Sequence, residues 1–182
     1  MAIGSVIVEG HAIVSEDGMI ADAQGVMPAG LRNEADWRLF QEALDRAELV
    51  VVGRLGHQRH PNSGRRRLVL TRQIADLAPD PGDPNATLWN PAGVPIGAVL
   101  QRLNVTNGAL AITGGSFDLF LPCYDRFALA EVPGFTIPSG TPCFRAGLPE
   151  PVLTAAGMKS GAPRVIDEAA GVTLTMWTRQ QG

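Results

Sequence analysis

Residues 110–121 read LAITGGSFDLFL, an apolar run that leads into a pair of glycines and a second apolar segment. The run over 109–113 is short and continuous, which is typical of a strand covered on both faces of its sheet. Gly114 and Gly115 turn the chain, and a short helix is predicted to follow and end near Pro122. A strand, a glycine turn and a helix in this order indicate an α/β fold.

The glycine pair is also a candidate phosphate site. A residue without a Cβ lets the backbone approach a pyrophosphate, and the helix that follows Ser116 directs unpaired N–H groups at an anion. The same turn is equally explained by its backbone angles alone, because isolated glycine motifs are weak evidence. The chain lacks a GxGxxG fingerprint after its first strand, so a Rossmann site is not predicted.

Apolar segments continue on both sides of this turn. We expect strands over 5–15, 49–53, 67–71, 127–132 and 172–178, and helices over 33–47 and 91–103. Asn33 is predicted to cap the first helix, Asp36 to place a favourable charge in its first turn, and Pro91 to begin the second helix. Prolines and turn residues over 76–90 predict an irregular connection. The elements together predict an α/β domain around a central, mainly parallel sheet.

Composition sets limits on the size and partners of the molecule. The chain has 182 residues and 45% hydrophobic content, so we expect one domain over 1–182. A net charge of -3 gives no general reason to bind nucleic acid or an anionic membrane. No segment reaches transmembrane length, so a cytoplasmic protein with reduced Cys123 and Cys143 is expected. The expected partners are a small-molecule substrate and a second copy of the chain in a homodimer.

The basic residues are concentrated, whereas the histidines form no recognisable site. Five arginines fall within 59–72, which favours a small anionic ligand despite the overall acidity. His57 and His60 have no acidic or cysteine partner near them in sequence, and His11 is distant, so no metal is expected. The chain also lacks a GxSxG elbow and a Walker glycine loop.

Four segments in order carry a family resemblance: IVSEDGMIA over 13–21, VVVGR over 50–54, GRRRLVLTR over 64–72 and ITGGSFDLFLP over 112–122. Together they resemble the dihydrofolate reductase-like superfamily. The closest similarity is to the C-terminal reductase domains of riboflavin-biosynthesis deaminase-reductases. The resemblance covers most of the chain. It implies a three-layer α/β fold with helices on both faces of a mainly parallel sheet and an antiparallel C-terminal edge.

The resemblance implies NADPH as the cofactor. In this family a Gly-Gly pair joined by a cis peptide contacts the pyrophosphate, and a Gly-Arg pair after a buried strand meets the 2′-phosphate. The implied cofactor-binding residues are Ala12, Ile13 and Ile20 for nicotinamide, Gly114, Gly115 and Ser116 for pyrophosphate, and Gly53, Arg54, Thr71 and Arg72 for the adenosine phosphate. The family has a threonine where this chain has Gly56, and we expect glycine to cap that helix instead.

Two substrates are compatible with the resemblance. The first is a pterin, because the segment from Met27 to Trp37 aligns Glu34 with the family's substrate-binding and catalytic carboxylate. Glu34 is equally explained as a favourable charge at the start of a capped helix.

The second substrate is a ribosylamino pyrimidine phosphate, as in the riboflavin-pathway reductases. The motifs Ser15-x-Asp17-Gly18-x-Ile20-Ala21 and 138–144 favour this interpretation. Arg65 is the candidate to bind its phosphate, or a folate carboxylate in the pterin alternative. An NADPH-dependent reductase of the riboflavin type is therefore predicted. A non-catalytic nucleotide-binding module remains an alternative from another class.

Overall fold

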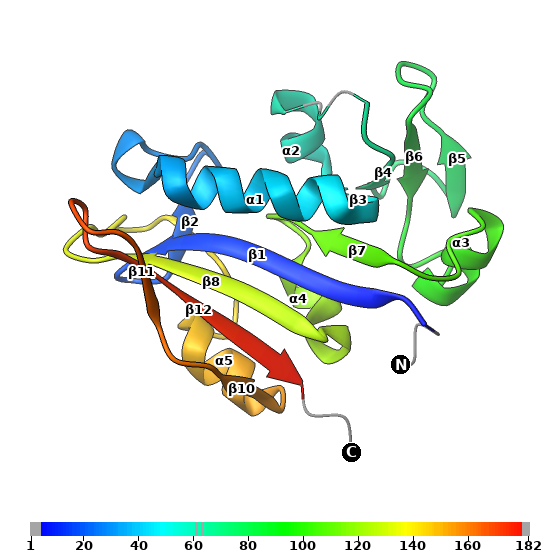
Figure 1. The fold of residues 1–182 in the computed structure, drawn as a ribbon. Helices are drawn as coiled ribbons and strands as arrows, with labels where there is room; N and C mark the ends of the chain where they lie inside the picture. The colour runs from blue at the N-terminus through cyan, green and yellow to red at the C-terminus, as the bar shows by residue number, and fades with distance from the viewer. Residues whose placement is uncertain (1–4, 61, 63, 180–182) are drawn as a thin grey trace.

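The computed structural model describes residues 5–60, 62 and 64–179. The strands are β1 (Ile7–Ser15), β2 (Met19–Ala21), β3 (Ala47–Gly53), β4 (Arg67–Leu70), β5 (Leu77–Pro79), β6 (Ala86–Trp89), β7 (Ala109–Ile112), β8 (Arg126–Val132), β9 (Thr141–Pro142), β10 (Met158–Ser160), β11 (Arg164–Asp167) and β12 (Val172–Arg179). The main sheet has the order β10-β12-β8-β1-β7-β3-β4-β6-β5, and β11 pairs with β12 (Figure 1).

The centre of this sheet is parallel and both of its ends are antiparallel. Strands β8, β1, β7, β3, β4 and β6 run parallel to their neighbours in that series. Strand β12 pairs antiparallel with β8, β10 and β11, which confirms the predicted antiparallel C-terminal edge. Strand β5 also pairs antiparallel with β6 at the other edge.

Helices cover both faces of the sheet (Figure 1). The helices are α1 (Glu34–Arg46), α2 (Arg54–Arg59), α3 (Ile96–Arg102), α4 (Phe117–Phe120) and α5 (Pro149–Ala155), with 3-10 turns η1 (Ala29–Leu31) and η2 (Leu121–Cys123). Helix α1 packs on Val50 of β3, and α2 lies over Val52. Helices α3, α4 and α5 enclose the main apolar core on the opposite face, against Val51. The predicted three-layer arrangement is therefore confirmed.

Strand β3 shows why these sequences form buried parallel strands. Leu49, Val50, Val51 and Val52 are each at most 3% exposed, and successive side chains enter opposite layers. A continuous apolar run is stable only where helices cover both sides of the sheet. The sequence prediction for this segment is correct.

Between residues 76 and 103 one prediction is wrong, and another is correct for the helix but wrong for its start. The segment over 76–90 contains β5 and β6 instead of an irregular connection. The predicted helix begins at Ile96 and has Pro95 as its N-cap, because 90–94 forms a turn in which Gly93 donates to Asn90. A Cβ on Gly93 would lie 1.9 Å from the Ala75 carbonyl oxygen, so this turn packs directly on the chain before β5.

At the start of α1, the predicted cap at Asn33 is correct, but the predicted role of Asp36 is incomplete. The Asn33 side chain accepts a hydrogen bond from the Asp36 backbone N–H at 3.1 Å, as expected of a cap. Asp36, however, is only 5% exposed. Its carboxylate lies 2.8 Å from Nε2 of His11 on β1, so it joins the helix to the sheet.

Both cysteines are free thiols, and burial raises the pKa of each. Cys143 is 3% exposed, whereas Cys123 is half-buried. We therefore expect iodoacetamide at pH 8 to leave Cys143 unmodified in the native protein and to modify it after unfolding in urea, because the thiolate is the nucleophile. Peptide mass mapping of the two samples measures this. Rapid modification of Cys143 without urea would contradict the buried placement.

No helix among the described residues is long and apolar enough to cross a membrane.

Candidate functional site

Three segments meet where β3 and β7 end. Val51 pairs with Ile112, so Gly53 and the glycine turn leave the sheet side by side. A Cβ on Gly53 would lie 3.5 Å from the Gly115 Cα, and a Cβ on Gly114 would lie 3.5 Å from Cδ1 of Ile20. Gly114 and Gly115 are exposed. The turn therefore presents accessible backbone at the carboxyl edge of the parallel sheet, where α/β proteins bind ligands.

Hydrogen bonds hold the glycine turn in place. The Thr113 hydroxyl donates to the Val51 carbonyl at 3.0 Å, and the Ser116 hydroxyl donates to the Thr113 carbonyl at 2.6 Å. Ser116 is 3% exposed, so its hydroxyl is used within the turn. Gly115 has φ +86°, a conformation that favours glycine. The described residues contain no cis peptide bond, so the expected cis peptide between Gly114 and Gly115 is wrong for this structure.

The residues predicted to face nicotinamide lie on and after β1. Ala12 and Ile13 are each 5% exposed and point into opposite layers, Ala12 into the main core and Ile13 into the cluster with Leu31. Ile20 is half-buried and contacts the position of the glycine turn. The structure thus brings Ile20 next to Gly114, whereas the side chains of Ala12 and Ile13 are packed in the core on the two faces of β1.

Two cations follow neighbouring strands at the same edge. Gly53 pairs with Leu70, so Arg54 begins α2 beside the point where β4 continues into Thr71 and Arg72. Both arginines are exposed, and neither makes a hydrogen bond or an ion pair within the described part of the chain. Thr71 is 8% exposed, and its hydroxyl oxygen accepts from the Gln73 N–H. The edge therefore carries two unpaired positive charges.

Gly56 does not cap α2, contrary to expectation. The helix begins at Arg54 with Gly53 as its N-cap, which places Gly56 inside the helix. A Cβ on Gly56 would lie 3.0 Å from Cγ2 of Val52. The absence of a side chain on Gly56 lets α2 pack closely on β3.

The two predicted substrate residues lie toward opposite ends of α1. Glu34, its first residue, is exposed and has no polar partner among the described residues. Arg65 bonds Asp45 at 2.6 Å and Gln41 at 2.9 Å. Gln41 and Asp45 follow Glu34 by about two and three helical turns, so they share its face of the helix but place Arg65 about 10 to 16 Å further along the axis, just before β4 begins. Any anion that binds Arg65 must compete with the Asp45 carboxylate.

The two motifs typical of riboflavin reductases are brought together. Strand β2 pairs with β9, and the Thr141 hydroxyl donates to the Asp22 carbonyl at 2.8 Å. Asp17 accepts from the Ser15 hydroxyl at 2.6 Å and from the Ile137 N–H at 3.0 Å. The Ser15 bond is the main cause that holds the pKa of Asp17 below its usual value. These motif residues fix the loop beside Ile20.

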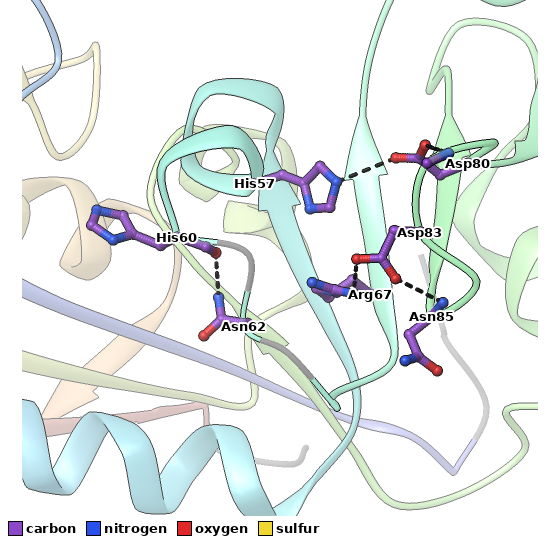
Figure 2. Close-up of polar contacts among 8 residues, drawn as sticks. His57, His60, Asn62, Arg67, Asp80, Asp83 and Asn85 are labelled. Atoms are coloured by element: carbon purple, nitrogen blue, oxygen red, sulfur yellow. Dashed lines mark hydrogen bonds and ion pairs between the residues drawn. The ribbon is translucent and has the colours of Figure 1, made fainter.

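A cluster of polar side chains, His57, Arg67, Asp80 and Asp83, lies beside α2 (Figure 2). His57 Nε2 lies 3.2 Å from the Asp80 carboxylate, and Arg67, which is 1% exposed, pairs with Asp83 at 2.5 Å. Figure 2 shows His60 pointing away from this group. Among the described residues, no three metal-binding side chains converge. The cluster therefore joins β4 and the turn after β5 to the helix that begins at Arg54.

Two contributors were missed by the sequence analysis. Arg59 of α2 donates to the carbonyls of Gly25 and Gln24, at 3.1 Å in the second case, and so holds the loop after β2 against α2. The buried pair of His11 and Asp36 is the other. In the sequence, Arg59 is only part of a basic stretch, and Asp36 is only a favourable charge in the first turn of a helix. Neither pattern indicates a partner that is distant in the sequence.

Comparison with solved structures identifies the fold. A riboflavin biosynthesis protein from Shewanella sp. PV-4 superposes with a TM-score of 0.68 and 18% identity over 97% of this chain and 100% of that one. Dihydrofolate reductase from Enterococcus faecalis, in complex with NADP(H), has a TM-score of 0.68 and 19% identity over 96% and 97%.

A third similar structure is a larger protein. The deaminase/5-amino-6-(5-phosphoribosylamino)uracil reductase from Thermotoga maritima has a TM-score of 0.66 and 17% identity, over 97% of this chain and 57% of that one. Neither the family models nor the curated proteins gave a match to the sequence. The chain therefore has the dihydrofolate reductase-like fold, and two of these three similar structures are named as reductases.

Proposed function

We propose that this protein is an NADPH-dependent reductase that transfers a hydride to a small heterocyclic substrate. The proposed substrate resembles the ribosylamino pyrimidine phosphate that the riboflavin-pathway reductases reduce. The observation that carries the proposal is the convergence of Gly53, Gly114, Gly115 and Ile20 at the carboxyl edge of the parallel sheet. The E. faecalis neighbour, which has this fold, is a complex with NADP(H).

The residues at this edge are suited to a dinucleotide phosphate. Exposed Gly114 and Gly115 leave room for a pyrophosphate, and Gly115 has the backbone angles that a side chain would disfavour. Arg54 and Arg72 have no acidic partner within the described residues, so their charges remain available to a 2′-phosphate. Bound NADPH would supply the hydride, and the protein would supply orientation.

The substrate is proposed to extend along α1, from Glu34 at the carboxyl edge of the sheet to Arg65, which precedes β4 at the amino edge. Arg65 would bind its phosphate, and Glu34 is the candidate to deliver a proton because its carboxylate has no other polar partner among the described residues. Trp37 on the same helix is 55% exposed and offers a face on which a planar ring can stack.

The function is tested by NADPH oxidation, followed at 340 nm, with phosphoribosylamino pyrimidine and dihydrofolate as separate substrates. We expect turnover of the pyrimidine and negligible turnover of dihydrofolate. The similar dihydrofolate reductase structure keeps the pterin alternative relevant, and robust dihydrofolate turnover would favour it. NADPH binding without turnover of either compound would favour a nucleotide-binding module.

NADPH is expected to bind about tenfold more tightly than NADH. Arg54 and Arg72 are exposed, so each pairing with the 2′-phosphate is screened and contributes about 0.5 to 1 kcal/mol. Fluorescence titration of the three tryptophans measures both affinities. The variant Arg54→Ala should reduce the preference, and Arg102→Ala on α3 is the control for loss of an exposed arginine. Equal affinities of the parent for both cofactors would remove the adenosine-phosphate assignment.

A further inference from the structure

A cleft away from the glycine turn lies between α1 and β12, on the face of the sheet that α1 covers. Its volume is about 140 Å³. Ala111 of β7, Ala128 of β8 and His11 of β1 form its base, and Phe40 and Met176 also line it. We propose that this cleft binds a single planar ring that carries an anionic group.

The size and lining of the cleft select one ring. An apolar cavity of about 150 Å³ holds one benzene molecule, so a ring of that size fits here and a fused bicycle does not. Ala111 of β7 and Ala128 of β8 leave space at the base of the cleft, whereas the Cβ position of Gly10 faces Phe127 in the core on the opposite face. The Phe40 and His11 rings that line this space favour a planar aromatic ligand over a branched aliphatic one.

A buried polar pair gives the cleft a hydrogen-bonding group. His11 lines the cleft, and the side chains of His11 and Asp36 are 9% and 8% exposed. Nε2 of His11 is engaged by the Asp36 carboxylate at 2.8 Å, which leaves Nδ1 as the ring nitrogen for a ligand. The centroid of the Phe40 ring lies 5.2 Å from the centroid of the His11 ring, so the two rings are in contact.

The charges at the mouth favour an anion. Arg46, Arg126 and Arg164 line it together with Glu9 and Glu42. Arg126 is paired with Glu9 at 3.2 Å, whereas the side chains of Arg46 and Arg164 make no hydrogen bond or ion pair within the described part of the chain. Two exposed, unpaired arginines beside an apolar cleft suit a carboxylate or phosphate attached to the ring.

This cleft is distinct from the proposed cofactor edge. Leu39 and Leu174 line the cleft and also pack in the cluster that buries Ile13. A ring beside His11 is thus separated by side chains from the proposed nicotinamide position. The inference therefore goes beyond the proposed function and does not depend on it.

Imidazole NMR tests the site directly, because the chain has only three histidines. Signals of His11, His57 and His60 are assigned with single His→Gln variants, and benzoate is titrated into the full-length protein. We expect saturable shifts of the His11 signals with a Kd of about 1 mM, as for a fragment of this size. Benzamide, which has the same shape without the charge, should bind about fivefold more weakly.

A second titration identifies the source of the ring. Uridine 5′-monophosphate presents a pyrimidine with its phosphate on a ribose, whereas benzoate is a simple aromatic acid. Tighter binding of the nucleotide supports a nucleotide-like ligand, and tighter binding of benzoate supports an aromatic acid. Absence of saturable His11 shifts with both probes overturns the proposal.

Variants separate this site from non-specific binding. The double variant Arg46→Ala/Arg164→Ala should weaken benzoate binding about tenfold, while Arg102→Ala, another exposed arginine in the last turn of a helix, should not. Met176 is 41% exposed, so Met176→Trp should narrow the cleft in a folded protein and abolish the shifts. Unchanged binding by both variants overturns the proposal. The proposal is also overturned if the parent protein is a dimer and Met176→Trp converts it to monomers, because a second copy of the chain then covers the cleft.

Discussion

The variant Gly115→Val is expected to lose NADPH affinity by about 100-fold or more while remaining folded. Gly115 is exposed and has φ +86°, and a branched Cβ there would both strain the backbone and occupy the space beside Gly53. A displaced turn would lose several hydrogen bonds to the pyrophosphate at once. Tryptophan fluorescence measures binding, and circular dichroism measures folding in the same samples.

Backbone strain alone must be distinguished from loss of the phosphate site. Gly134 also has a positive φ, +68°, and a Cβ there would meet no heavy atom within 4 Å. Gly134→Val therefore imposes comparable strain, about 1 to 3 kcal/mol, far along the chain from the glycine turn. We expect it to bind NADPH like the parent. Normal binding by Gly115→Val would show that the glycine turn is only structural.

The buried strands could be predicted because they lie between helices on both faces. Val50, Val51 and Val52 form a continuous apolar run, and such a run leaves one stable arrangement in an α/β domain. The Asn33 cap was also predictable, since its effect depends only on residues three positions apart. Local patterns were therefore sufficient for the central sheet and for the start of α1.

The segment from β5 to α3 could not be predicted from local patterns. Prolines at 79, 81 and 84 indicate a loop, yet Pro79 ends an edge strand, where a missing N–H has little cost. Trp89 is 2% exposed because Phe120 packs against it from a distant helix. Tertiary packing thus stabilises β6 where the sequence pattern favours a turn.

The candidate site shows the same division between local and distant contacts. Gly53, Gly114 and Gly115 were identified because each follows a buried strand. Their contact with Ile20 depends on the order of strands in the sheet. The bond between Asp36 and His11 and the contact of Arg59 with Gly25 join residues 25 and 34 positions apart. No spacing in the sequence signals either contact.

The roles of Glu34 and Arg65 are separated by one set of substitutions. For the riboflavin-type reaction, Arg65→Ala should lower kcat/KM for the phosphoribosylamino pyrimidine about 10- to 100-fold, through loss of charge-assisted bonds to its phosphate. Glu34→Gln should have a smaller effect on this substrate. NADPH affinity should be unchanged in both variants, since neither side chain lies among the residues predicted to bind the phosphates of the cofactor.

Asp45 supplies the control for Arg65. Asp45→Ala removes the 2.6 Å ion pair but keeps the guanidinium, whereas Arg65→Ala removes both. If Arg65 binds substrate, Asp45→Ala should retain activity because the carboxylate no longer competes with the phosphate. Equal losses in the two variants would assign Arg65 a structural role on α1. Robust dihydrofolate turnover by the parent that disappears in Glu34→Gln would instead establish the pterin reaction, with Glu34 as the residue that protonates the substrate.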